Sequence, residues 1–264
     1  MTRAGLFLIG LLLGVSISYP VETQLQRANR MLHEFWQEVR EASEQRDLAR
    51  FTPQEYTQRL TIIENVVNQG ILSAVKQPLR PSAGELEMEL RAELSLHAPM
   101  PELASVFTHQ TAGRKLYVVA YALSVSATGS RSWIGVVGSR GTGKPNEVLA
   151  DVENSLANKT VAIQPLSPAG DGTLTFLARG IGWGDPHRHL TAIVYSFDGH
   201  KLIPLLTRSD LTEGEVKSEG ARIELRFLTV ARGPGYPPSP VRTEIYRLAA
   251  SGIKLEKSWE EKRQ

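Results

Sequence analysis

Residues Lys115–Val125 read KLYVVAYALSV and form the strongest strand-like stretch of the sequence, since they combine β-branched, aromatic and other apolar residues. Comparable runs follow at TLTFLARG (173–180) and RIELRFLTV (222–230). Across residues 101–259, short apolar runs alternate with Gly, Pro, Asp and Ser, which is typical of all-β proteins. The sequence therefore predicts a mainly β domain over these residues.

These three runs belong to three similar segments. Val106, Val161 and Val216 are equally spaced along the chain, and each begins the same predicted order of four strands. Over roughly Pro101–Trp259, this order resembles the four-stranded meanders of propeller blades in general, without a diagnostic motif. Three blades would leave exposed strand edges, which proteins avoid, so a β-sandwich or barrel is the alternative.

The segment before the β domain predicts a helical hairpin over residues 19–78. Apolar residues recur there at alternating intervals of four and three, which places them in one stripe along a helix: Val21, Leu25, Ala28, Leu32, Phe35, Val39 and Ala42. A second helix is expected to begin at Pro53, with Thr52 as its cap and Glu55 completing a capping box. The short polar connection favours antiparallel packing within one chain, and an oligomerising coiled coil is the alternative.

Residues 79–100 separate the helical and β regions and give mixed signals. Leu79–Gly84 reads LRPSAG, a Pro- and Gly-containing linker that marks the domain boundary. In Gly84–Leu96, apolar residues alternate with the period of a strand, yet most of the residues are good helix formers. The balance favours a strand only slightly, with a helix as the alternative. Residues 260–264 form a polar tail.

Residues 1–18, MTRAGLFLIGLLLGVSIS, have the three parts of an export signal. Arg3 supplies a basic start, an apolar run extends from Ala4 to Val15, and Ser16–Ser18 places small residues where a signal peptidase cleaves. The apolar run is short for a membrane-spanning helix, which needs about 20 residues. We expect a periplasmic or secreted protein, with an uncleaved membrane anchor as the alternative.

The composition excludes several classes of protein. Of the 264 residues, 41% are hydrophobic and 22% are charged, which supports a packed core. Thirty Lys and Arg residues against 28 Asp and Glu residues leave a net charge of +2 without a long basic run, so nucleic acid is not an expected partner. The absence of cysteine excludes disulfides, thiol catalysis and Cys-ligated zinc, and in an exported chain it suits a bacterial envelope.

A glycine-rich stretch after the apolar run Trp133–Val137 partly matches the sequence of a phosphate-binding loop. Gly138, Gly143 and Lys144 fit the spacing G-x-x-x-x-G-K of such loops. The next residue should be Ser or Thr, whose hydroxyl binds magnesium, but Pro145 offers neither a hydroxyl nor an N–H group. We therefore expect a connection between two strands, with neither a nucleotide site nor a cofactor. An exposed loop in which Arg140 and Lys144 contact an anion is the alternative.

Two loops hold the candidate ligand-binding residues. In the first, Asp185, His187 and His189 alternate along the chain, so their side chains would face the same way in an extended segment. Asp185, His187 and His189 are therefore candidate metal ligands. Trp183, His187 and His189 could together form a ligand surface. In the second, Tyr236 lies in the middle of the Pro-rich run GPGYPPSP, a stiff loop suited to recognition. For both loops, a purely structural connection is the alternative.

The hydrolase motifs G-x-S-x-G and H-E-x-x-H do not occur, so we assign no catalytic residue. The repeated β pattern and the apolar helical stripe favour an exported, non-catalytic binding or scaffold protein of the cell envelope, with a protein or other envelope partner. One alternative is a loop-built hydrolase or metal-binding enzyme centred on Asp185, His187 and His189. Another is a structural homo-oligomer, held at the membrane by an uncleaved N-terminal segment.

Overall fold

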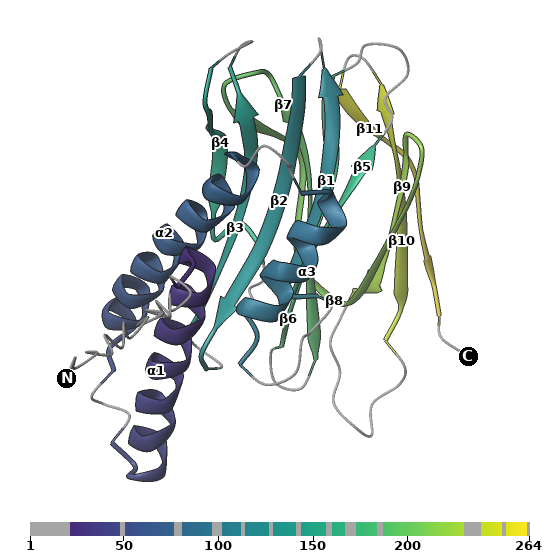
Figure 1. Ribbon diagram of the computed structural model, residues 1–264. Coiled ribbons are helices and arrows are strands. Elements are labelled where there is room, and N and C mark those ends of the chain that lie inside the picture. Colours follow the sequence, from purple (N-terminus) through teal and green to yellow (C-terminus); the bar gives the residue numbers. More distant parts are fainter. Residues whose placement is uncertain are drawn as a thin grey trace, which may run out of the picture.

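A computed structural model describes residues 22–47, 51–76, 81–96, 102–111, 114–126, 129–140, 144–156, 160–166, 173–183, 187–229, 239–249 and 252–262, with Trp183 described by its backbone alone. Within these ranges the chain is mainly β, as expected, and forms three helices followed by eleven strands (Figure 1). The helices are α1 (Gln24–Glu44), α2 (Pro53–Lys76) and α3 (Ala83–Glu93). The strands are β1 (Ala104–Thr111), β2 (Arg114–Ser124), β3 (Ser130–Ser139), β4 (Asn146–Glu153), β5 (Thr160–Leu166), β6 (Leu174–Trp183), β7 (Arg188–Phe197), β8 (Leu202–Glu219), β9 (Arg222–Leu228), β10 (Val241–Ala249) and β11 (Gly252–Glu261).

The strands form two antiparallel sheets, with the orders β1-β2-β3-β4 and β11-β10-β9-β8-β7-β6-β5. The three equally spaced valines lie in strands, Val106 in β1, Val161 in β5 and Val216 in β8. Neither sheet closes on itself in the described ranges, so the expected propeller arrangement is not found. The physical reason is that β8 is one long strand that ends the second predicted meander and begins the third. Its hydrogen bonds to β7 and β9 therefore join both meanders into a single open sheet.

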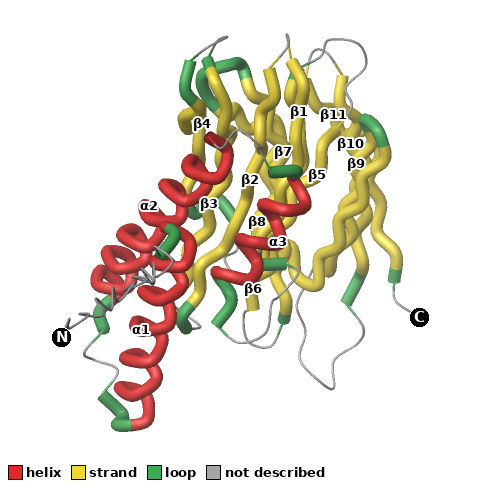
Figure 2. Tube along the Cα trace, in the orientation of Figure 1, coloured by secondary structure: helices red, strands yellow, loops and turns green. Residues whose placement is uncertain are grey.

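Strand β2 is apolar on both faces and decides how the layers stack, because successive side chains of a strand point to opposite sides. One face packs against the helices through Tyr117, Val119, Tyr121 and Leu123. The other face packs against the seven-stranded sheet through Leu116, Val118, Ala120 and Ala122. The four-stranded sheet therefore lies between the helices and the larger sheet (Figures 1 and 2), and the two sheets pack face to face as in a β-sandwich.

Strand β8 bends near its middle, so the seven-stranded sheet has two arms. Its first half pairs with β7 and its second half with β9, and both ladders are irregular at the bend. Asp210 and Glu213 have positive φ angles of 56° and 48° there. Gly214 follows, where a Cβ atom would come within 2.8 Å of Leu190 Cβ on β7. A third apolar cluster, drawn from β6 and β7 on one arm and β9 and β10 on the other, fills the space between the arms.

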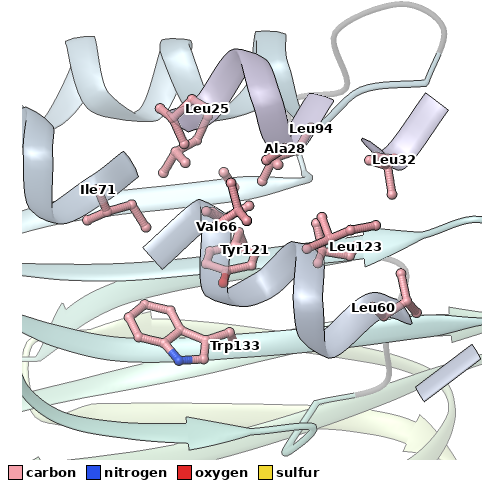
Figure 3. Packing of buried hydrophobic residues seen from close by; sticks show 14 of the residues in the cluster. Leu25, Ala28, Leu32, Leu60, Val66, Ile71, Leu94, Tyr121, Leu123 and Trp133 are labelled. Carbon is pink, nitrogen blue, oxygen red and sulfur yellow. The ribbon is translucent and has the colours of Figure 1, made fainter. Parts of the chain in front are cut away.

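Helices α1 and α2 form the expected antiparallel hairpin. Leu25 of α1 packs at Gly70 of α2, whereas the Phe35 ring lies 5.6 Å from that of Tyr56, near the other end of α2. Figure 3 shows apolar side chains of both helices over β2 and β3. The stripe residues within α1 are all buried: Leu25, Ala28, Leu32, Phe35, Val39 and Ala42. Other residues of the same chain therefore cover this stripe.

Capping boxes begin both α2 and α3. The expected box before α2 is confirmed, since the Thr52 N–H donates to Glu55 Oε2 at 2.7 Å and the Glu55 N–H donates to Thr52 Oγ1 at 3.2 Å. Ser82 makes the same reciprocal bonds with Glu85 at the start of α3. The slight preference for a strand in Gly84–Leu96 is therefore wrong, because α3 covers Ala83–Glu93. The alternation of apolar and polar residues indicated a strand, but the apolar residues do not all lie on one buried face. On the helix, Leu86 and Leu90 are buried, whereas Met88 is 66% exposed.

Trp133 of β3 is wholly buried where the sheet meets α2. Its ring stacks on that of Tyr121 with centroids 5.4 Å apart, and its indole Nε1 donates to Asp151 Oδ2 on β4 at 3.0 Å. Tyr121 in turn donates its hydroxyl to Asn68 Oδ1 of α2 at 2.9 Å. The indole lies over Gly135, two residues along the same face of β3, where a Cβ atom would overlap the ring. Trp133 can therefore occupy this position only because residue 135 is glycine.

Replacement of Gly135 by alanine tests this packing. Gly135→Ala is expected to lower the free energy of unfolding by about 1–3 kcal/mol, because the new methyl group forces the Trp133 ring out of place. Urea denaturation followed by circular dichroism measures the change. Gly84→Ala is the control, since a Cβ atom at position 84 meets nothing within 4 Å and alanine favours the helix α3. Equal stability of Gly135→Ala and the wild type would contradict the described packing.

Candidate functional site

A cleft of about 560 Å³, here named the end cleft, opens where β1 and β3 end and β2 and β4 begin. These strand ends lie at the top of Figure 1. The four-stranded sheet contributes His109, Thr111, Arg114, Leu116, Arg140 at the end of β3, and Leu149. The seven-stranded sheet and its β7–β8 turn contribute Thr173, Leu174, Phe197, Asp198, Gly199 and His200. The cleft therefore lies between the two layers of the sandwich, where strand ends rather than a single loop position its side chains.

The floor of the end cleft is apolar and continuous with the core between the sheets. Leu116, Leu149, Leu174 and Phe197 line the cleft and belong to the inter-sheet cluster. Gly138, one of the glycines of the apparent phosphate-binding spacing, shapes this floor, because a Cβ atom there would lie 2.6 Å from Leu116 Cδ2. The four apolar residues are only 3–8% exposed, so the floor presents a small apolar area at the bottom of the cleft.

Two arginines and two histidines line the rim of the end cleft: Arg114, Arg140, His109 and His200. Arg140 Nε donates to Glu147 Oε1 on β4 at 2.6 Å, so a carboxylate lies beside this guanidinium. Arg114 Nη1 donates to the main-chain carbonyl oxygens of Arg140 and Ser139, at 2.6 and 3.4 Å. These bonds hold the start of β2 to the end of β3 and fix the Arg114 guanidinium at the rim.

Asp198 begins the turn between β7 and β8, as its Asp-Gly sequence predicts. Gly199 has a φ of 98°, a conformation that glycine adopts readily. Asp198 Oδ1 accepts hydrogen bonds from the backbone N–H groups of His200 and Lys201, both at 2.8 Å. The bond from Lys201, and then that from His200, holds the pKa of the Asp198 carboxyl below its ordinary value. The carboxylate is therefore charged at neutral pH and is a weak base.

The apparent phosphate-binding stretch is the connection between β3 and β4, as expected. Strand β3 ends at Ser139, and the antiparallel strand β4 begins at Asn146. Ser139 Oγ donates to the carbonyl oxygen of Lys144 at 2.9 Å, and the side chains of Lys144 and Pro145 are exposed. A phosphate-binding loop needs a helix after it, because the helix N-terminus supplies N–H donors, and here a strand follows. Gly143 lies outside the described residues.

The two histidines of the predicted metal site have different surroundings. His187 precedes β7, and its Nδ1 lies 3.5 Å from Glu213 Oε1 in the bend of β8. The Glu213 carboxylate also accepts a hydrogen bond from the backbone N–H of Arg188 at 3.2 Å. This bond is the main cause that lowers the pKa of the Glu213 carboxyl below its ordinary value. His189 lies within β7, and its buried Nδ1 has no hydrogen-bond partner among the described residues. In the described part of the chain, no three His, Asp or Glu residues form a group able to hold a metal ion.

The remaining predicted ligand-binding residues lie outside what the structure describes. This applies to Asp185 and Tyr236, and to the side chain of Trp183, whose backbone ends β6. The Asp185–His187–His189 metal site and the Tyr236 recognition loop therefore stay predictions. The structure adds one residue that the sequence interpretation did not consider, since Glu213 comes within ion-pair distance of His187.

A buried ion-pair cluster joins α2 to the four-stranded sheet. Arg131 of β3 is 6% exposed, and its Nε and Nη2 donate to the two carboxylate oxygens of Glu64 in α2 at 2.7 and 3.2 Å. Arg131 Nη2 also pairs with Glu153 of β4. Burial raises the pKa of the Glu64 carboxyl above its ordinary value, and Arg131 acts in the opposite direction. A cavity of about 240 Å³ adjoins Arg131, but both carboxylates here are already paired, so we assign the cluster a structural role.

Sequence interpretation missed most of the end cleft. His109, Arg114, Arg140 and His200 follow no shared spacing or motif. They come from three strand ends and one turn, and only the packing of two sheets brings them together. The Asp198-Gly199 sequence by itself indicates a turn and not a ligand site. No local sequence pattern identifies this group, because contacts between distant segments bring its members together.

Comparison of the chain with protein-family models, with curated proteins and with solved structures gives no significant match. A function must therefore be argued from the molecule's own geometry. The end cleft is the candidate site because its volume lies in the range of small-molecule sites and its lining brings charged and hydrogen-bonding side chains together over an apolar floor.

The structural role of the Arg131–Glu64 pair can be tested by substitution. Arg131→Met is expected to lower the free energy of unfolding by about 3–5 kcal/mol at neutral pH, because Glu64 is left as a buried charge facing Glu153. Without Arg131 the pKa of Glu64 rises further, so the folded state binds a proton more tightly than the unfolded state. The deficit should then narrow as pH falls through the raised pKa.

Urea denaturation at neutral and mildly acidic pH measures this deficit. The double variant Glu64→Gln/Arg131→Met should recover much of the loss at neutral pH, since the carboxylate is gone. Arg222→Met, at an exposed arginine of β9, is the control and should change stability little. A deficit that stays constant or widens on acidification would show that Glu64 is not its source.

Proposed function

We propose that the chain is an exported, non-catalytic binding protein of the cell envelope and that the end cleft holds its ligand. The observation that carries the proposal is the cleft of about 560 Å³, which combines an apolar floor with a polar rim. Ligand sites commonly have volumes of about 300–1,000 Å³, and polar groups in them fix the orientation of the ligand. Strand ends of both sheets hold the lining residues, so the site is largely preformed.

The chemistry of the Asp198 carboxyl and of Arg114 suits ligand binding better than acid–base catalysis by that carboxyl. Asp198 is the carboxylate among the described lining residues, and its backbone hydrogen bonds lower its pKa. A catalytic acid or base works best with a pKa near the working pH, which for a carboxyl requires a raised value. Arg114 is held by two carbonyl groups and stays charged, which suits it to holding a ligand.

Filling the end cleft tests the binding proposal. N-phenyl-1-naphthylamine, a neutral probe that fluoresces in apolar surroundings, is expected to bind the protein saturably. Thr111→Trp places a large side chain at a lining position and should abolish this binding. Thr108→Trp is the matched control, because residue 108 is exposed on the same strand and does not line the cleft. Unchanged probe binding by Thr111→Trp, or no saturable binding by the wild type, would overturn the proposal.

Export is the second part of the proposal, and residues 1–18 support it through their basic start, apolar run and small residues. Helices long and apolar enough to cross a membrane are absent from the described residues, which begin at residue 22.

A reporter enzyme that works only outside the cytoplasm tests export when it is fused after Ser18. We expect activity from this fusion in a bacterial host, and loss of activity when Leu12→Arg interrupts the apolar run. Ser16→Ala, which keeps a small residue near the cleavage site, should leave the activity unchanged. An inactive fusion that accumulates in the cytoplasm would refute the export prediction.

A further inference from the structure

The Arg114 guanidinium has one edge in use and one edge open among the described residues. Its Nη1 donates to the carbonyl oxygens of Arg140 and Ser139, whereas its Nε and Nη2 have no hydrogen-bond partner within the described ranges. The Nε–Nη2 edge carries two parallel donors that match the two oxygens of a carboxylate. Arg131 uses this same edge to hold both oxygens of Glu64, at 2.7 and 3.2 Å. Arg114 is therefore oriented by the backbone and open to a carboxylate.

The charges around the rim favour one negative charge on the ligand. Of the two lining arginines, Arg140 is paired with Glu147, and the described residues place no carboxylate in an ion pair with Arg114. Asp198 adds one negative charge to the same rim. A ligand with a single negative charge gains the attraction of Arg114. A second negative charge on the ligand would add to its repulsion by Asp198.

A second polar group lines the end cleft without a partner. His109 lies on β1 opposite Leu116 of β2, and both residues line the cleft. The His109 Nε2 atom is buried and has no hydrogen-bond partner in the described part of the chain. A buried polar atom without a partner costs free energy, which a ligand or a water molecule can recover. The apolar floor lies beside these groups, so the ligand should join an anionic head to an apolar body.

We propose that the end cleft binds a monoanionic amphiphile of the carboxylate class, such as a medium-chain fatty acid, and that the Arg114 guanidinium selects its charge. This inference rests on the proposed function, in which the end cleft is a ligand site. The carboxylate lies against the Nε–Nη2 edge of Arg114, and the alkyl chain covers Leu116, Leu149, Leu174 and Phe197. Arg114 is thus a specificity-determining residue, and the binding involves no covalent step.

Isothermal titration calorimetry with probes of equal chain length tests the inference. Octanoate is expected to bind the wild-type protein at least tenfold more tightly than octan-1-ol, because a hydrogen-bonded charge pair contributes about one order of magnitude or more in affinity. Octylammonium should bind more weakly than octan-1-ol, and octyl phosphate, which carries more than one negative charge at neutral pH, more weakly than octanoate. Equal affinities of octanoate and octan-1-ol would overturn charge selection while leaving the cleft as a binding site.

Variants of Arg114 separate charge recognition from the shape of the cleft. Arg114→Gln should lose the preference for octanoate and keep the affinity for octan-1-ol, whereas Arg114→Lys should keep a part of the preference. Arg222→Gln, at an exposed arginine of β9 that does not line the cleft, is the control and should behave as the wild type. Wild-type preference in Arg114→Gln, or loss of octan-1-ol binding together with octanoate binding, would overturn the specificity role. If no probe binds the wild type, the proposed function itself fails.

Discussion

The burial of β2 on both of its faces is the constraint on which the rest of the structure depends. A strand that is apolar on both sides must be covered on both sides, because exposed apolar area is costly in water. Helices cover the face that carries Tyr121, and the seven-stranded sheet covers the face that carries Val118. The layers therefore follow the order helices, four-stranded sheet, seven-stranded sheet. The three meanders therefore do not surround a common axis.

Two local features hold this stack together. At the helical side, the buried pair of Arg131 and Glu64 fixes the position of α2 on β3, since a misplaced helix would leave buried charges unpaired. At the opposite side, the bend of β8 at Asp210–Gly214 folds the second arm of the larger sheet over the first, and the third apolar cluster covers the outer face of β7. Strand β7 thereby has apolar neighbours on both of its faces.

The end cleft is a consequence of stacking sheets whose strands end together. Along the strands, side chains of the two sheets fill the space between the layers, but the layer ends at Leu116, Leu149, Leu174 and Phe197. Polar residues of the strand ends then surround an apolar floor. The proposed binding role of Arg114 depends on this context, because carbonyl groups of the neighbouring strand hold its Nη1, whereas its Nε and Nη2 have no partner among the described residues.

Features that depend on neighbouring residues followed from the sequence alone. These are the α1–α2 hairpin with its Thr52–Glu55 cap, the succession of antiparallel strands, the turn at Asp198 and the connection that contains Lys144. Periodicity and capping report backbone conformation, because they act over one or two turns of chain. In Gly84–Leu96, strand-like alternation competed with the helix preference of the residues. The segment forms a helix that buries Leu86 and Leu90 against the rest of the protein. Only the tertiary structure decided three other features, because the free energy of burying apolar faces depends on contacts between distant segments. These features are the joining of two meanders through β8, the order of the layers, and the placement of Arg114 and Phe197 in one cleft.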